Sequence, residues 1–160
     1  VFLLINLLYF VGAIPPLPLA LKDAGVFHSV VRTGVEYAVT YEPRAWYEVY
    51  LRYNRVFHRA PGEAVYVFTA IFAPAGISTG LKHEWQYYNA SKSDWITKDT
   101  VSFTISGGRD GGYRGYTLRR SIEEGYWRVN VLTDYGALIG RVEFEVKDTP
   151  APAALESGTR

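Results

Sequence analysis

The chain has 160 residues and a mass of 18.0 kDa, which is enough for one domain and too little for a barrel enzyme or a doubly wound α/β fold. Hydrophobic residues make up 48% and charged residues 21%, a globular composition and not a disordered one. Because 17 basic residues nearly balance 16 acidic ones, the chain lacks the basic excess of a nucleic-acid surface, and we predict no nucleic-acid partner. The absence of cysteine excludes disulfides, thiol catalysis and thiolate metal sites.

The first segment of the chain is unusually apolar. Residues 1–21 contain no charged side chain. A helix formed by residues 1–14 would be about 21 Å long, which is shorter than the hydrocarbon core of a bilayer, about 30 Å. We therefore expect residues 1–21 to be the C-terminal part of a transmembrane helix that contacts membrane lipid, with a proline-rich exit at Pro15, Pro16 and Pro18. The absence of methionine fits a piece of a longer chain. Two alternatives stay open: a buried helix or strand of a water-soluble fold, and a secretory signal peptide.

Alternation of apolar and polar residues indicates β-strands through most of the chain after Arg44. Leu81, His83 and Trp85 alternate with charged or amide side chains, which places the tryptophan on an inward face. Residues 63–72 are apolar on both faces, as expected of a central strand. Further strands are expected at residues 45–53, 101–105, 113–118, 126–131 and 138–146.

These patterns predict an all-β fold over residues 45–146, an antiparallel β-sandwich of immunoglobulin-like or related type, preceded by the end of the transmembrane helix. Residues 134–136 (DYG) are expected to form a hairpin loop. Residues 22–44 are a connecting segment with room for an extra strand pair. Residues 147–160 lose all periodicity and are predicted to be a flexible tail.

The chain is rich in aromatic residues, with 13 Tyr, 8 Phe and 4 Trp. One set is expected to face inward and build the core: Trp85, Phe103, Tyr116, Trp127 and Phe144. A second set is expected to face outward: Trp46, Tyr50, Tyr88, Trp95, Tyr113 and Tyr126. Grouped exposed rings favour contact with a glycan, a partner protein or the lipid interface. The alternative is that these rings pack beneath residues 22–44 and the loops.

Several segments together carry a family resemblance. They are residues 14–19 (IPPLPL), 83–85 (HEW), 107–116 (GGRDGGYRGY), 125–129 (GYWRV) and 139–141 (IGR) followed by Phe144. Over residues 14–146 the chain resembles the bacterial family catalogued as domain of unknown function 2914. The resemblance implies a multi-pass protein of the bacterial cytoplasmic (inner) membrane that ends in an all-β domain. It implies no catalytic residue, because the family has no established activity.

The side of the membrane is indicated by charge alone. Only Lys22 and Arg32 follow the apolar segment closely, and Asp23 opposes them, so the basic cluster of a cytoplasmic flank is missing. We therefore expect the β domain to be extracytoplasmic.

The glycine-rich run 107–116 is the most conspicuous candidate for a ligand loop. A phosphate-binding loop would open a helix and continue with Lys and Ser or Thr, whereas a strand pattern follows here. The plain structural interpretation is a wide turn whose arginines pair with carboxylates. His28, His58 and His83 are too far apart for a zinc motif, so we predict no metal and no cofactor. We expect His83 to be buried and the other two histidines to lie at the surface.

Our first hypothesis is a noncatalytic, membrane-tethered domain that binds an envelope glycan or polymer, or a protein partner. The predicted ligand-binding residues, at the glycine-loop end, are Arg109, Tyr113, Arg114, Tyr126 and Arg128. No catalytic constellation is readable, so no catalytic residue is predicted. Two alternatives stay open: a structural or oligomerisation module of a membrane protein, and a hydrolase of envelope polymers, which would need converging carboxylates in a pocket.

Overall fold

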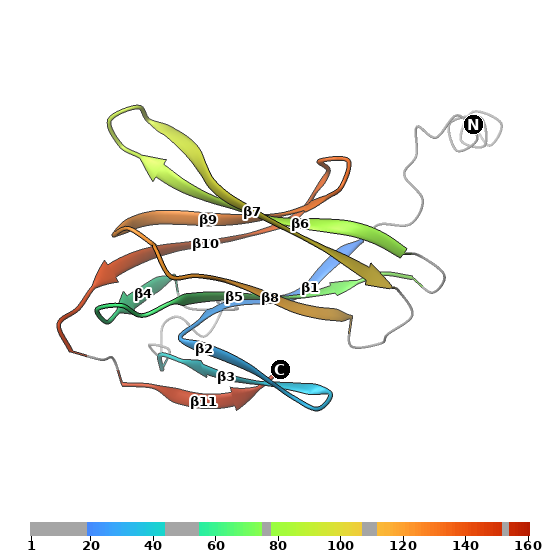
Figure 1. Ribbon diagram of the computed structural model, residues 1–160, viewed down its shortest axis with the longest axis horizontal. Coiled ribbons are helices and arrows are strands. Elements are labelled where there is room, and N and C mark those ends of the chain that lie inside the picture. The colour runs from blue at the N-terminus through green and yellow to red at the C-terminus, as the bar shows by residue number, and fades with distance from the viewer. Residues whose placement is uncertain (1–18, 44–54, 75–77, 107–111, 152–153) are drawn as a thin grey trace, which may run out of the picture.

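The computed structural model describes residues 19–43, 55–74, 78–106, 112–151 and 154–160. These ranges contain strands only (Figure 1). The strands are β1 (Ala20–Phe27), β2 (Ser29–Thr33), β3 (Glu36–Tyr41), β4 (Val56–Arg59), β5 (Val65–Phe72), β6 (Ser78–Asn89), β7 (Asp94–Ser106), β8 (Tyr113–Arg119), β9 (Gly125–Thr133), β10 (Leu138–Asp148) and β11 (Glu156–Thr159).

Two sheets form the body of the molecule and lie face to face (Figure 1). The smaller sheet has the strand order β1-β5-β8, and the larger has the order β4-β10-β9-β6-β7. Every neighbouring pair in both sheets is antiparallel except β4 and β10, which run parallel. The predicted all-β sandwich is therefore confirmed, with one parallel pair at an edge.

The core of the sandwich lies between the inner faces of these two sheets. Val65 and Val67 of β5 pack against Trp85 of β6 and Trp127 of β9 in one buried cluster. Trp85, Trp127 and Phe144 face inward as the alternation predicts. Burial of large aromatic and branched side chains on both inner faces is the main free-energy gain that holds the two sheets together.

A third sheet, with the order β11-β3-β2, covers the outer face of the smaller sheet (Figure 1). Its Val30 and Val39 pack against Phe27 and Phe68 in a second buried cluster. The structure here places strands in two segments that lie outside the predicted sandwich of residues 45–146. Residues 22–44 contain most of β1 as well as the strand pair β2 and β3, and the segment predicted to be a flexible tail contains β11, which pairs with β3 from Glu156↔Tyr41 to Thr159↔Ala38.

The start of β1 overlaps the segment predicted to lie in or leave a membrane. Ala20 and Leu21 pair with Phe72 and Ile71 of β5, so these two residues belong to the sandwich. The side chain of Leu21 packs against two buried clusters, the one that contains Trp85 and Trp127 and the one that contains Ile71 and Leu81. Residues 1–18, with Pro15, Pro16 and Pro18, lie outside the described ranges. Among the described residues, no helix has the length and apolarity to cross a membrane.

Two predicted side-chain orientations on β8 are wrong, since Tyr113 packs inward against Ile71, Leu81 and Ile105, whereas Tyr116 faces outward. Tyr116 is 38% exposed on the outer face of β8, because small Gly115 and Thr117 occupy the inward positions beside the bulky Phe103, His83 and Trp85. The strand predicted at residues 45–53, with Trp46 and Tyr50, lies outside the described residues.

Candidate functional site

The structure divides the predicted ligand-binding residues between two faces of the molecule. Tyr126 and Arg128 lie on the outer face of β9, in the larger sheet. Tyr113 and Arg114 lie on β8, in the smaller sheet. Arg109 lies outside the described residues. The predicted residues thus do not form one cluster.

On β8 the two predicted residues have structural contacts. Tyr113 packs inward against the buried cluster of Ile71, Leu81 and Ile105. Arg114 points to the opposite face, where its Nη1 donates a hydrogen bond to the carbonyl oxygen of Arg160 at 3.1 Å. These contacts fasten β8 to its neighbours, so the remaining candidate surface is the outer face of the larger sheet.

Three aromatic side chains gather at one end of that outer face. Tyr88 of β6 is paired with Trp95 of β7, and their ring centroids are 5.2 Å apart at an interplanar angle of 57°. Tyr126 of β9 is 57% exposed beside them. Together with Glu143 these rings line an open hollow of about 260 Å³. This hollow is slightly smaller than drug-sized ligand pockets, which are about 300–1,000 Å³.

Local backbone features position these rings. The β6–β7 turn is closed by hydrogen bonds from the Lys92 amide to the carbonyl and side-chain oxygens of Asn89, and Ser93 adopts a positive φ of 51°. The turn thereby brings Trp95 opposite Tyr88. Gly125 begins β9 at a φ of 130°, where a Cβ atom would lie 3.1 Å from the ring of Tyr87, so glycine is required for Tyr126 to follow in this register.

A network of polar side chains continues from the aromatic end across the strands. The guanidinium of Arg128 donates from Nε to Gln86 Oε1 at 2.6 Å. Asn130 Nδ2 donates to the same oxygen at 3.1 Å and to Glu84 Oε2 at 2.9 Å. Arg141 Nε donates to Asn130 Oδ1 at 2.7 Å. Each of these side chains is held by a neighbour, so the polar part of the face is rigid and pre-oriented.

Arg128 connects the polar network to the aromatic end. Its guanidinium carbon lies 4.2 Å from the centroid of the Trp95 ring, a cation–π contact worth about 0.5–1 kcal/mol at an exposed site. Basic and acidic groups alternate along the network, with Arg128 and Arg141 beside Glu84 and Glu143. The face therefore offers fixed hydrogen-bond donors and acceptors with little net charge, next to aromatic rings.

We define the candidate face as these side chains on the outer face of the larger sheet. Its members are Glu84, Gln86, Tyr88, Trp95, Tyr126, Arg128, Asn130, Arg141 and Glu143. The sequence analysis identified Tyr88, Trp95, Tyr126 and Arg128 as outward-facing or ligand-binding. The sequence did not single out Gln86, Asn130 and Arg141, although these residues occupy outward positions of the predicted strands. The pairing of β6 with β9, which places Gln86 opposite Arg128, would have identified Gln86.

The histidines differ in environment. His83 is buried as predicted, with Nε2 3.0 Å from Thr69 Oγ1 and Nδ1 3.0 Å from Thr117 Oγ1. His28 was expected at the surface but is 7% exposed, because it stacks on the ring of Phe57 and contacts carboxylates on both sides. Within the described ranges, no group of three or more His, Cys, Asp or Glu side chains is arranged to hold a metal ion.

The chain has similarity to a solved structure and to a protein family. A crystal structure of an immunoglobulin-like protein from Pseudomonas aeruginosa aligns with a TM-score of 0.43 and 11% identity, covering 83% of this chain and 99% of that one. No curated protein matches the chain. The family described as protein of unknown function (DUF2914) matches residues 78–146, from the first residue of β6 nearly to the end of β10. The match confirms the predicted resemblance to this family over residues 78–146, which include the whole candidate face. The resemblance of the residues before 78 stays a prediction.

Proposed function

We propose that the chain is a noncatalytic β-sandwich domain that binds an envelope glycan or polymer through the candidate face. The observation that carries the proposal is the open aromatic hollow of Tyr88, Trp95 and Tyr126 beside a pre-oriented polar network. Sugar rings present apolar C–H faces that stack on aromatic side chains, and their hydroxyl groups both donate and accept hydrogen bonds. The candidate face supplies partners for both kinds of contact within one surface.

The charge pattern favours a hydroxyl-rich ligand over a strongly anionic or cationic one. Glu84 and Glu143 lie among Arg128 and Arg141, so a polyanion meets carboxylates and a polycation meets guanidiniums. Fixed side chains also lose little conformational entropy when a ligand binds, which lowers the cost of association.

The proposal places this domain at the surface of the bacterial cytoplasmic membrane, on the extracytoplasmic side. Two observations support attachment to the membrane. Residues 1–18 carry no charge, and the family that the chain resembles includes multi-pass membrane proteins. A glycan-binding face on such a domain would hold the membrane protein against an envelope polymer.

Substitution of Trp95 or Tyr126 by alanine tests the binding face. We expect the 160-residue chain to bind at least one envelope polysaccharide or its soluble fragments, measured by titration calorimetry against a panel of neutral and anionic oligosaccharides. Trp95→Ala and Tyr126→Ala are each expected to weaken that binding about tenfold, because each removes an aromatic stacking surface.

Tyr135→Ala is the matched control. Tyr135 is also an exposed tyrosine, 94% accessible, but it lies in the turn between β9 and β10 and does not line the hollow. We expect this variant to bind like the wild type. Equal loss in all three variants, or binding that none of them changes, would refute the proposed face.

A further inference from the structure

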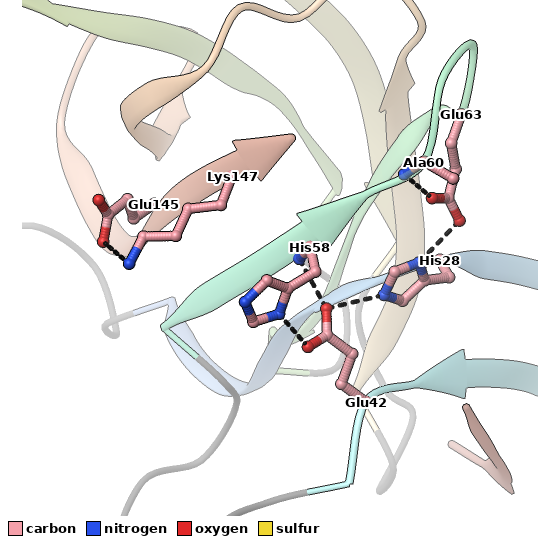
Figure 2. A network of polar contacts seen from close by, with 7 residues as sticks. All are labelled: His28, Glu42, His58, Ala60, Glu63, Glu145 and Lys147. Atoms are coloured by element: carbon pink, nitrogen blue, oxygen red, sulfur yellow. Dashed lines mark hydrogen bonds and ion pairs between the residues drawn. The ribbon is translucent and has the colours of Figure 1, made fainter. Parts of the chain in front are cut away.

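A cluster of two histidines and two glutamates lies where the third sheet meets the sandwich (Figure 2). His28, in the short connection between β1 and β2, has Nδ1 2.7 Å from Glu63 Oε1 and Nε2 3.1 Å from Glu42 Oε1. Glu42 also lies 2.7 Å from His58 Nδ1 through Oε2, and its Oε1 accepts a hydrogen bond from the backbone amide of His58 at 2.7 Å. Glu63 accepts a second hydrogen bond from the amide of Ala60 at 2.9 Å.

The geometry at His28 requires a protonated ring. A neutral imidazole carries one N–H, so one of its nitrogens would direct a lone pair at a carboxylate oxygen. Both nitrogens of His28 lie within hydrogen-bond distance of a carboxylate, and the side chain is only 4% exposed, so water cannot screen such a repulsion. When Glu42 and Glu63 are both ionised, only the imidazolium satisfies both contacts at once.

This ring connects elements of all three sheets. Glu42 follows β3 of the third sheet, Glu63 precedes β5 of the smaller sheet, and His58 belongs to β4 of the larger one. His28 itself marks the point where the chain leaves β1 and enters the third sheet, and its backbone amide donates to the carbonyl of Thr40 on β3 at 2.8 Å. The contacts of His28 therefore fix how the third sheet docks.

Other charged groups near the cluster are engaged with each other. On β4, Arg59 forms an ion pair with Asp148 of β10 at 2.7 Å. On β10, Lys147 lies 3.6 Å from Glu145, and both appear at the edge of the cluster in Figure 2. Among the described residues, the titratable groups in direct contact with His28 are Glu42 and Glu63.

We propose that protonation of His28 is a pH-sensitive switch that docks the third sheet, β2-β3-β11, onto the sandwich. With the imidazolium present, Glu42 and Glu63 are both satisfied and the third sheet is held. When the proton leaves, one carboxylate faces a ring lone pair, and the contact to β3 or to β5 opens.

The pH range follows from the two partners. Burial disfavours the charge on His28, but the hydrogen bonds and negative charges of Glu42 and Glu63 outweigh it and raise the pKa of His28 above its ordinary 6.5. Stabilisation from His28 is therefore complete below pH 6.5 and is lost as the pH rises through the raised pKa of His28.

Glu42 sets the acidic limit. Burial opposes the charge on Glu42, but hydrogen bonds from His28 and His58 lower the pKa of Glu42 below its ordinary 4.5. The stabilisation from Glu42 is therefore lost only as the pH falls through this lowered pKa. Docking is strongest between about pH 4.5 and 6.5.

Amide hydrogen exchange of the 160-residue chain tests the switch. After correction for the intrinsic rate at each pH, we expect protection of β2 and β3 to fall between pH 6 and pH 9, by about tenfold for each unit by which the pKa of His28 is raised. Protection of β9 is expected to change little over the same range. In His28→Gln, whose amide cannot titrate, the pH dependence of β2 and β3 should disappear.

His58→Gln is the matched control, since it also removes a histidine that contacts Glu42 but leaves His28 between two carboxylates. Its β2 and β3 amides are expected to keep the pH dependence. Nitrogen NMR of the wild type at pH 6 should show both ring nitrogens of His28 protonated. A neutral ring at pH 6, or a pH dependence that persists in His28→Gln, would overturn the proposal.

Discussion

Two buried histidines show how partners, and not burial alone, decide the charge of a side chain. His28 lies between two carboxylates, which raise its pKa. His83 lies between the hydroxyls of Thr69 and Thr117, which satisfy a neutral ring but supply no negative charge. Burial therefore dominates at His83 and lowers its pKa to about 4. Protonation favours docking at His28 and disfavours folding at His83.

The lowered pKa of His83 predicts acid destabilisation of the sandwich core. The unfolded chain takes up this proton near pH 6.5, whereas the folded chain resists it down to about pH 4. The free energy of unfolding is therefore expected to fall as the pH drops through this range, by about 3 kcal/mol in total. Urea denaturation at several pH values measures the effect.

His83→Gln provides the comparison for that experiment. Glutamine can hydrogen-bond to Thr69 and Thr117 but lacks the ring that packs edge-on against Phe103, so the variant is expected to be less stable at pH 7. Because glutamine cannot be protonated, the stability of the variant is expected to depend less on pH below pH 7. The difference between the two pH profiles isolates His83 from the other titrating groups. Parallel profiles would show that His83 does not titrate as described.

At the scale of elements, alternation predicts strands well where a strand has one buried face. β6 and β9 were predicted with the correct inward side chains, because Trp85, Trp127 and Val129 stand out from their polar neighbours. The strand predicted at residues 113–118 is β8, but its inward face was not predicted, because the inward residues Gly115 and Thr117 are small. Alternation also does not predict β11, whose residues pair with β3 through backbone atoms and carry no apolar pattern.

The candidate face was only partly predictable for a related reason. Period-two alternation predicts which side chains point outward, but not which strands are neighbours. Tyr88 and Trp95 share a hairpin, so their proximity follows from a local turn. Tyr113 and Tyr126 were grouped by their nearness along the chain, yet β8 and β9 enter different sheets. Strand order is set by tertiary packing, which a single sequence does not display.

The packing of β1 against β10 predicts the effect of one small substitution. A Cβ atom on Gly140 would lie 2.5 Å from Cδ2 and 3.0 Å from Cβ of Leu21, so Gly140→Ala forces β1 and β10 apart. We expect the free energy of unfolding to fall by about 1–3 kcal/mol, as for other overpacked cores. Thermal or urea denaturation of the purified variant provides the measurement.

Leu21→Ala distinguishes this clash from a general effect on β10. Removing the leucine side chain relieves the distal contact, so the double variant is expected to be less destabilised than the sum of the two single variants. If the destabilisation of the double variant equals the sum of the two single variants, Leu21 does not pack on Gly140. β1 would then not pack against β10 as the structure shows.

At the scale of the whole molecule, the three sheets differ in how they are held. The larger sheet has β9 and β6 paired on both sides, and their inward side chains lie in the buried clusters of the sandwich. The third sheet consists of short strands and packs on the smaller sheet through a smaller cluster together with the contacts of His28. Local opening is favoured where few buried apolar contacts are lost.

This difference predicts an order of amide protection across the molecule. At pH 6, where His28 is protonated, we expect the slowest exchange in β9 and β6, intermediate exchange in β5, and the fastest exchange among strands in β11. β11 is an edge strand of four residues, and it can detach without exposing the core between the two larger sheets. Hydrogen exchange followed by mass spectrometry measures all these strands in one sample, so each serves as the internal control of the others. Exchange of β11 as slow as that of β9 would mean that the three sheets open as a single cooperative unit.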